Sequence, residues 1–266
     1  MNKITKLTCG VISGLVLSMV AASAQSITLS GVNPSISENF DSMGTAGTTP
    51  PTGWFVGTSL SGSTSGTNGT FTAGAVTVGT GSSNTGANYN FGSSASTDRA
   101  LGSVASGTGN TRVMEARFFN NTSLTITGLV VSYTGEEWRN GGNTAAQQLS
   151  LHVSLDGTTF TALGAAFNFT SPTVGATAAA LDGNAAANRT TGIGGSIDFT
   201  SLLGGLTNGA TLYVRWVDIN DAGTDHGLAI DDLSVSFATM AVPEPSTVVL
   251  VGAGLFGLLA IRRRHS

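Results

Sequence analysis

The clearest pattern in the chain is an alternation of hydrophobic and polar side chains with a period of two. Leucine or valine occupies every second position from 149 to 155, and Asp156-Gly157 follows shortly before Thr159-Phe160-Thr161. Successive side chains of a strand point to opposite faces, so the alternation predicts a half-buried strand. An Asp-Gly pair between two such runs predicts a hairpin turn.

Comparable runs recur along most of the chain and indicate its fold class. They cover residues 124–133, 211–218 and 228–237, with shorter alternations in the Gly/Ser/Thr/Asn-rich stretch 57–110. We interpret that stretch as short strands joined by long turns, and residues 175–195 as a loop. From Gln25 to Thr239 we find no helical period of useful length. The sequence therefore predicts an all-β fold, a single β-sandwich of the jelly-roll type over residues 25–241.

The first 24 residues have the organisation of a secretory signal peptide. Lys3 and Lys6 form a positive start, residues 11–20 are largely apolar, and Ala22-Ser23-Ala24 offers the small side chains that signal peptidase accepts. Cleavage is therefore expected before Gln25. The alternative, a first transmembrane helix, is disfavoured because the apolar run is short.

The C-terminal residues 242–266 form a second targeting element with three parts. Val242-Pro243-Glu244-Pro245 predicts a stiff, extended start, because proline fixes φ and lacks a backbone donor. Residues 247–261 carry no charge and predict a transmembrane helix of about 22 Å, shorter than the roughly 30 Å hydrocarbon core. Arg262, Arg263 and Arg264 then act as a membrane stop, which places the preceding domain outside the cell.

This order of parts resembles the PEP-CTERM sorting signal, a family also called an ice-binding protein C-terminal domain. The resemblance implies that an exosortase recognises Pro243, Glu244 and Pro245, and that the helix holds the chain in the inner membrane only transiently. It further implies a destination at the cell surface or in the extracellular matrix, in association with exopolysaccharide or biofilm. The alternative for the tail is a permanent single-pass anchor.

The charges between the two ends exclude one class of partner. Of fifteen acidic residues, fourteen lie between Gln25 and Ala241, together with six arginines and no lysine, so this part carries a formal charge near −8. Such a domain lacks the basic surface that nucleic acids require. Cys9, in the leader, is the one cysteine of the chain, so the exported domain has no disulfide.

Acidic residues near both ends of the domain suggest a divalent cation. The segment Gly227 to Val235 resembles the closing strand of concanavalin-like and carbohydrate-binding jelly rolls, in which a carboxylate there joins one from the first strand around a structural calcium. The resemblance implies a Ca²⁺ site formed by Glu38 or Asp41 with Asp231 or Asp232. Independently of it, the acidic loop 218–226 before this strand could supply carboxylate oxygens to calcium, and Asp225 is its candidate ligand. An ordinary solvated turn is the alternative for that loop.

The remaining candidates concern carbohydrate. Trp138, in Glu136-Glu137-Trp138-Arg139, has the ring that stacks on sugars, although a tryptophan in a β-domain is more often part of the core. Paired carboxylates would also serve glycoside hydrolysis if they flanked a cleft. The sequence contains no nucleophile elbow, phosphate loop, zinc signature or redox motif, and we assign no catalytic residue.

The sequence thus predicts a non-catalytic surface or matrix protein, calcium-stabilised and delivered by signal peptidase and an exosortase. Two alternatives remain open: a carbohydrate-binding module for a polysaccharide, and a glycan hydrolase.

Overall fold

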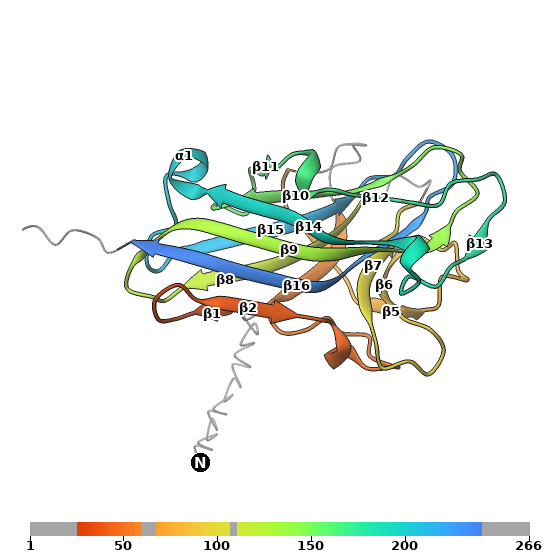
Figure 1. The fold of residues 1–266 in the computed structure, drawn as a ribbon, viewed down its shortest axis with the longest axis horizontal. Helices are drawn as coiled ribbons and strands as arrows, with labels where there is room; N and C mark the ends of the chain where they lie inside the picture. Colours follow the sequence, from red (N-terminus) through yellow and green to blue (C-terminus); the bar gives the residue numbers. More distant parts are fainter. Residues whose placement is uncertain (1–25, 60–67, 107–110, 241–266) are drawn as a thin grey trace, which may run out of the picture.

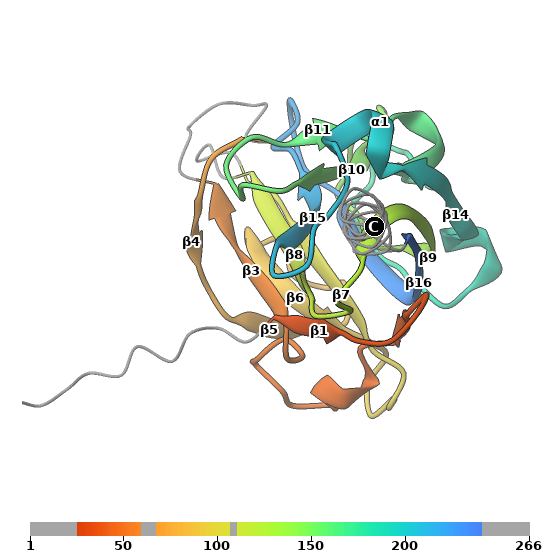
Figure 2. The same cartoon turned by 90° about the vertical axis from the view of Figure 1, so that its left-hand side faces the viewer.

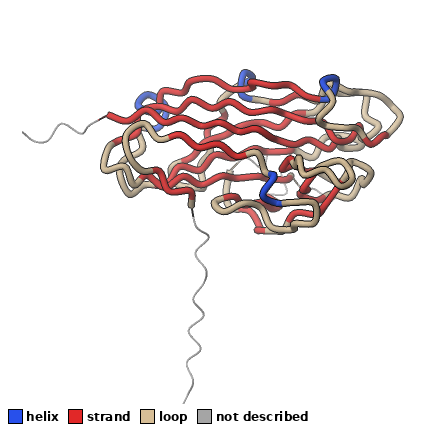
Figure 3. Tube along the Cα trace, turned by 60° about the horizontal axis from the view of Figure 1, so that its bottom comes forward, coloured by secondary structure: helices blue, strands red, loops and turns tan. Residues whose placement is uncertain are grey.

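The computed structural model describes residues 26–59, 68–106 and 111–240, which fold into two stacked β-sheets (Figures 1 and 2). The predicted signal peptide and the tail 242–266 lie outside these residues. Strands run along the long axis of the molecule, and the short helical segments lie at its margins (Figure 3). The predicted all-β sandwich is confirmed.

The first sheet, sheet A, is built around the central strand β8. Its order is β11 (Thr161–Ala162), β10 (Gln148–Ser154), β15 (Thr211–Asp218), β8 (Arg112–Asn120), β3 (Trp54–Ser59) and β4 (Phe71–Ala73). β1 (Ile27–Leu29) pairs parallel with β8, and β12 (Phe169–Thr170) pairs with β10.

The second sheet, sheet B, is built around two long strands. Its order is β13 (Ala179–Ala180), β9 (Thr125–Asn140), β16 (Gly227–Met240), β7 (Ala100–Val104), β6 (Ala87–Phe91) and β5 (Val76–Gly79). β14 (Arg189–Asp198) pairs with β9, and β2 (Ser35–Glu38) pairs with β16. The helical segments are η1 (Asp41–Met43), η2 (Ala165–Phe167), η3 (Ala186–Asn188) and α1 (Phe199–Leu203).

The main core lies between the two sheets and follows from the alternation in the sequence. Leu149, Leu151 and Val153 of β10 are fully buried, and the hairpin after them forms as predicted, with Val153 paired to Thr161. In β16, buried Leu233, Val235 and Phe237 alternate with exposed Ser234, Ser236 and Ala238. Each strand therefore contributes one face to the interior and leaves the other outside.

A second, smaller core covers part of the outer face of sheet B. The ring of Phe91 stacks on Tyr89 and on Trp138, with centroids 4.8 and 5.8 Å apart. A Cβ on Gly183 would lie 2.3 Å from Trp138 Nε1, so the loop that carries Gly183 packs directly on the indole. Both faces of sheet B are buried in this region.

One sequence prediction fails in the second half of the chain. The sequence predicts a loop over residues 175–195, but β14 begins at Arg189 and is ten residues long. Eight of these residues pair with β9, with an irregularity between Thr190 and Ile193. A Cβ on Gly194 would meet the carbonyl oxygen of Val131 at 2.0 Å. Glycine therefore serves here to bring two backbones close together, and its presence does not indicate a loop.

Among the residues that the structure describes, no helix has the length and hydrophobicity needed to cross a membrane.

Candidate functional site

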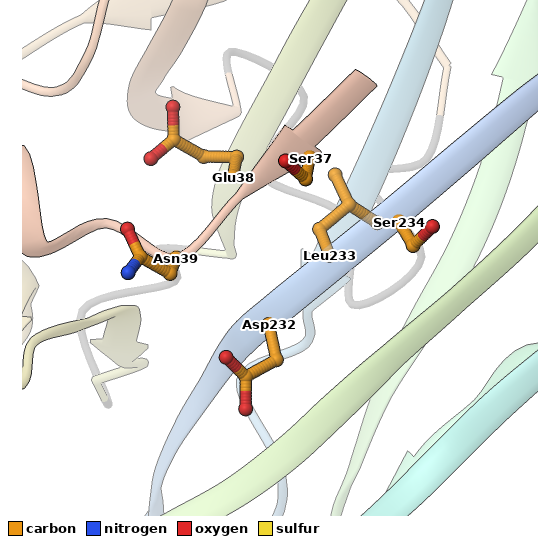
Figure 4. Close-up of a pocket in the computed structure, with 6 residues that line it drawn as sticks. All are labelled: Ser37, Glu38, Asn39, Asp232, Leu233 and Ser234. Atoms are coloured by element: carbon orange, nitrogen blue, oxygen red, sulfur yellow. The ribbon is translucent and has the colours of Figure 1, made fainter. Parts of the chain in front are cut away.

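The first and last strands of sheet B meet as the sequence predicts. β2 pairs antiparallel with β16, which places Glu38 opposite Leu233 and next to Asp232. A polar groove of about 350 Å³ lies between them, lined by Ser37, Glu38, Asn39, Asp232, Leu233 and Ser234. Figure 4 shows that the carboxyl groups of Glu38 and Asp232 leave the two strands in different directions.

A β-bulge separates the two neighbouring aspartates of β16. The pairing with β9 shifts register between Asp231 and Ser234, and Asp232 has a left-handed φ of 47°. Asp231 is consequently buried and Asp232 is exposed. Bulges of this kind redirect side chains at the edges of functional sites.

Asp231 shares its surroundings with other carboxyl groups. Burial first, and then the charges of Glu136, Asp232 and Asp98, raise its pKa to about 8. Burial also raises the pKa of Glu136 to about 7. One Glu136 oxygen, Oε2, accepts a hydrogen bond of 2.8 Å from Trp138 Nε1, whereas Oε1 is buried without a hydrogen-bond partner in the described part of the chain.

Asp41 lies close to this group and already has partners. Its Oδ1 accepts a hydrogen bond of 2.9 Å from the backbone N–H of Arg99, and its Oδ2 accepts one of 2.7 Å from Asn39 Nδ2. The charge of Asp41 also helps to raise the pKa of Asp98, after burial. Glu38, Asp41, Asp231 and Asp232 therefore gather at one end of sheet B.

Asp225 lies apart from these four residues. Its Oδ1 accepts a hydrogen bond of 2.9 Å from the backbone N–H of Asp221, and it lines a different pocket, together with Arg139 and Gly141. Burial first, and then the charge of Asp221, raises its pKa to about 6. In the ranges 26–59, 68–106 and 111–240, no three His, Cys, Asp or Glu side chains converge in a metal-binding group.

His226, the histidine beside these acids, is part of a buried network. Its Nδ1 lies 2.9 Å from Glu137 Oε1, and both side chains are fully buried. Burial lowers the pKa of His226, but the hydrogen bond and charge of Glu137 more than offset this and the net shift is upward. Glu137 Oε2 also accepts a hydrogen bond of 2.7 Å from the backbone N–H of Thr173. The pair holds loops together and is closed to solvent.

Trp138 belongs to the interior. It is 1% exposed, between Phe91 and the loop at Gly183, so its ring offers no face to a sugar. Trp54 and Trp216 are also buried and stack on each other at 5.6 Å. Trp138 therefore has the role in the core that the sequence left open as the alternative to stacking on a sugar.

The structure reveals a second site, on the outer face of sheet A. We call it the arginine–aromatic cleft: a cavity of about 320 Å³ whose lining includes Phe55, Thr70, Phe71, Arg117, Gly157 and Arg215. Phe55 on β3, Arg117 on β8 and Tyr213 on β15 come from three neighbouring strands, because Phe55 pairs with Glu115 and Tyr213 pairs with Arg117. Phe55, Phe71 and Tyr213 are all partly exposed.

A buried carboxylate fixes the two arginines of this cleft. Glu115 Oε2 lies 2.7 Å from Arg215 Nη2, and Glu115 Oε1 accepts a hydrogen bond of 2.8 Å from Arg117 Nε. The Arg215 guanidinium lies 3.6 Å from the ring centroid of Phe160, and that of Arg117 lies 3.8 Å from the centroid of Phe55. Burial lowers the pKa of Arg215, against the opposing charge of Glu115.

Sequence reasoning missed this cleft, although a signal was present. In β8 and β15 the outward positions hold Glu115, Arg117, Tyr213 and Arg215, where small Ser and Thr side chains are common on the outward positions of β10 and β16. Large charged and aromatic residues at outward positions of two strands would have marked the face.

Comparison with known proteins identifies the tail. The PEP-CTERM protein-sorting motif matches residues 241–264, which confirms the prediction for residues 242–266. No curated protein matches the chain.

Several solved structures match the chain, and one of them illustrates how weak the likeness is. It is the N-terminal CBM22-1-CBM22-2 tandem domain of Xyn10C from Paenibacillus barcinonensis, with 9% identity and a TM-score of 0.38. The match covers 82% of this chain and 48% of that one, so the chain spans about half its length. A structural likeness this weak is no evidence that the two proteins share a function. The chain is an exported protein with an all-β ectodomain, sorted by an exosortase through a C-terminal PEP-CTERM motif.

Proposed function

We propose that the exported domain is a non-catalytic surface or matrix protein that binds a polysaccharide through the arginine–aromatic cleft. The observation that carries this proposal is the pair of partly exposed rings, Phe55 and Phe71, that line a cavity on the outer face of sheet A. Aromatic rings offer sugars a rigid apolar surface at small entropic cost, and charged groups beside them fix orientation.

The rigidity of the cleft supports binding. Phe55 and Glu115 lie opposite each other on paired strands, and the two ion pairs of Glu115 hold the arginines in place before any ligand arrives. A preorganised surface loses little conformational entropy when a ligand binds.

The absence of catalysis is part of the proposal. Glu115 is fully buried beneath the cleft and is engaged by Arg117 and Arg215, so it is poorly placed to donate or take a proton. Glycoside hydrolysis needs two carboxyl groups that flank the scissile bond. Among the described residues that line the cleft, none is acidic.

The proposal is tested by affinity electrophoresis of the purified full chain in detergent against a panel of neutral and acidic polysaccharides. We expect retardation by at least one polymer, no release of reducing ends, and a roughly tenfold weaker affinity for Phe71→Ala. Val130→Ala, at an exposed position of sheet B, serves as the matched control. Retardation by no polymer, or retardation that Phe71→Ala leaves unchanged, would refute it.

Calcium stabilisation is a second proposal, supported by the carboxyl groups at the end of sheet B. Asp231 and Glu136 are buried near Asp98 and Asp232, and Glu136 Oε1 has no partner in the described residues. Calcium prefers such oxygens and would relieve their mutual repulsion. Glu38, at the end of β2, and Asp41, in η1, are the further candidates from the start of the domain. Because no three acidic side chains converge within the described part of the chain, the site would also need backbone carbonyls or water.

A further inference from the structure

We infer that the ligand of the arginine–aromatic cleft is an acidic glycan, whose carboxylate binds the terminal nitrogens of Arg117. This inference rests on the proposed function and specifies its ligand class.

Arg117 is fixed in orientation but only partly used. Its Nε donates to Glu115 Oε1 at 2.8 Å, and its Cζ lies 3.8 Å from the ring centroid of Phe55 and 5.3 Å from that of Tyr213. The two terminal nitrogens, Nη1 and Nη2, have no hydrogen-bond partner among the described residues. The side chain is 29% exposed and lines the cleft. A planar, oriented pair of donors therefore faces the cavity.

The local charge favours an anion. Two guanidinium groups, of Arg117 and Arg215, share one carboxylate, that of Glu115, so the cleft has a positive excess. Arg215 also donates to the carbonyl of Gly69, which leaves Arg117 as the arginine directed at a ligand. The positive charge of the cleft contrasts with the formal charge of the exported domain as a whole, which is near −8.

The other arginines that the structure describes do not offer the same arrangement. Arg99 donates to the side chain and backbone of Asn90, and Arg139 donates to the carbonyls of Gly81 and Ser82. Arg112 donates to Thr58 and Gly86. Arg189 is exposed and is the natural control.

A carboxylate on a sugar ring matches both parts of the cleft. The flat guanidinium fork binds a carboxylate through two parallel hydrogen bonds, which a hydroxyl or an ester cannot reproduce. The apolar face of the same sugar would pack against Phe71, which lines the cavity beside Arg117. An acidic polysaccharide thus satisfies charge and apolar surface together.

The test compares polygalacturonate with its fully methyl-esterified form, two polymers that share one backbone and differ in charge. Binding to the full chain in detergent is measured by titration calorimetry in EGTA, so that calcium does not crosslink the polymer. We expect the acid to bind roughly tenfold to a hundredfold more tightly than the ester. Arg117→Gln should remove this difference, Arg117→Lys should retain part of it, and Arg189→Gln should leave it unchanged.

The outcomes separate the inference from the function on which it rests. If the wild-type protein bound the acid and the ester equally well, and Phe71→Ala abolished the binding of both, the acidic-glycan inference would be overturned. The polysaccharide-binding function would be retained. An acid preference that survives in a folded Arg117→Gln protein would also overturn the inference. Binding of neither polymer, nor of any other in the polysaccharide panel, would overturn both. Near-ultraviolet circular dichroism of each variant confirms that it is folded. The comparison of acid and ester binding by the wild-type protein does not depend on any variant.

Discussion

The guanidinium of Arg117 lies over the ring of Phe55, with its Cζ 3.8 Å from the ring centroid. The two residues come from adjacent strands, β8 and β3, and their contact places a cation and an aromatic ring on one face of sheet A. Such a contact contributes about 0.5–1 kcal/mol at an exposed site. Its larger consequence is geometric, because it fixes the direction in which the free nitrogens of Arg117 point.

Removal of the buried carboxylate under the cleft is expected to destabilise the domain. Glu115→Gln leaves Arg215, which is 2% exposed, without its charge partner, and the loss of one member of a buried pair costs about 3–5 kcal/mol. Urea unfolding followed by tryptophan fluorescence measures the change. Asp182→Asn, at an exposed position, is the control and should change the unfolding free energy by less than about 0.5 kcal/mol. Equal effects of both substitutions would contradict the structural role of Glu115.

The stability of the domain should fall as the pH rises from 6.5 to 8.5. Burial raises the pKa of Asp218 to about 8 and that of Asp231 to about 8, so the folded protein keeps protons that the unfolded chain has already lost. Glu136, with a pKa raised to about 7 by burial, acts in the same direction. Stability therefore decreases with pH through this window.

His152 works in the opposite sense, but at lower pH. Burial lowers the pKa of His152 to about 4, with a further contribution from Arg215, so its effect lies below pH 6.5. Melting temperatures measured at half-unit steps in EGTA test the prediction. Asp218→Asn keeps an acceptor for the Ser103 hydroxyl, which now donates at 2.7 Å, and should reduce the slope. A melting temperature that rises from pH 6.5 to 8.5 would show the assignment to be wrong.

Calcium should raise the melting temperature, and more at pH 8 than at pH 5.5. A ligand that binds only the folded state stabilises it, and calcium binds ionised carboxyl groups, which raised pKa values keep protonated in acid. Asp231→Asn should abolish the shift, whereas Asp225→Asn, at the separate pocket, should not. No shift between calcium and EGTA at pH 8 would exclude calcium stabilisation.

The sorting motif gives a prediction about export. Replacement of Pro243, Glu244 and Pro245 by alanine removes the stiff element before the apolar segment, so the exosortase should no longer process the chain. The uncleaved protein should then stay in the inner-membrane fraction, as shown by fractionation and intact mass. Replacement of Ser246 alone serves as the control. Normal release of the triple variant would contradict recognition of this motif.

The sequence predicted the strands whose alternation is regular and whose turns are short. The Asp156-Gly157 hairpin and the strand at 211–218 formed as expected. β14 was missed because its glycines, including Gly194, look like a loop until the close approach to Val131 is known. Local composition cannot show that a neighbouring backbone excludes a Cβ.

The two candidate sites also differ in how far the sequence could predict them. The nearness of Glu38 and Asp232 could be predicted, because it follows from the pairing of the early strand β2 with the last strand, β16. For the arginine–aromatic cleft the sequence could have marked the face, through the charged and aromatic outward residues of two strands. It could not have shown the site itself, because Phe55, Arg117 and Tyr213 are far apart in the chain and meet only through the strand order β3-β8-β15.

The central claim is that the outer face of sheet A is the ligand-binding surface, and mapping of amide chemical shifts by NMR tests it most directly. The labelled protein is titrated with a short oligogalacturonate in EGTA. We expect the largest shifts at Phe55, Phe71 and Arg117. Shifts confined to the polar groove at Ser37 and Asp232, or no shifts at a concentration where the polymer binds, would contradict the account.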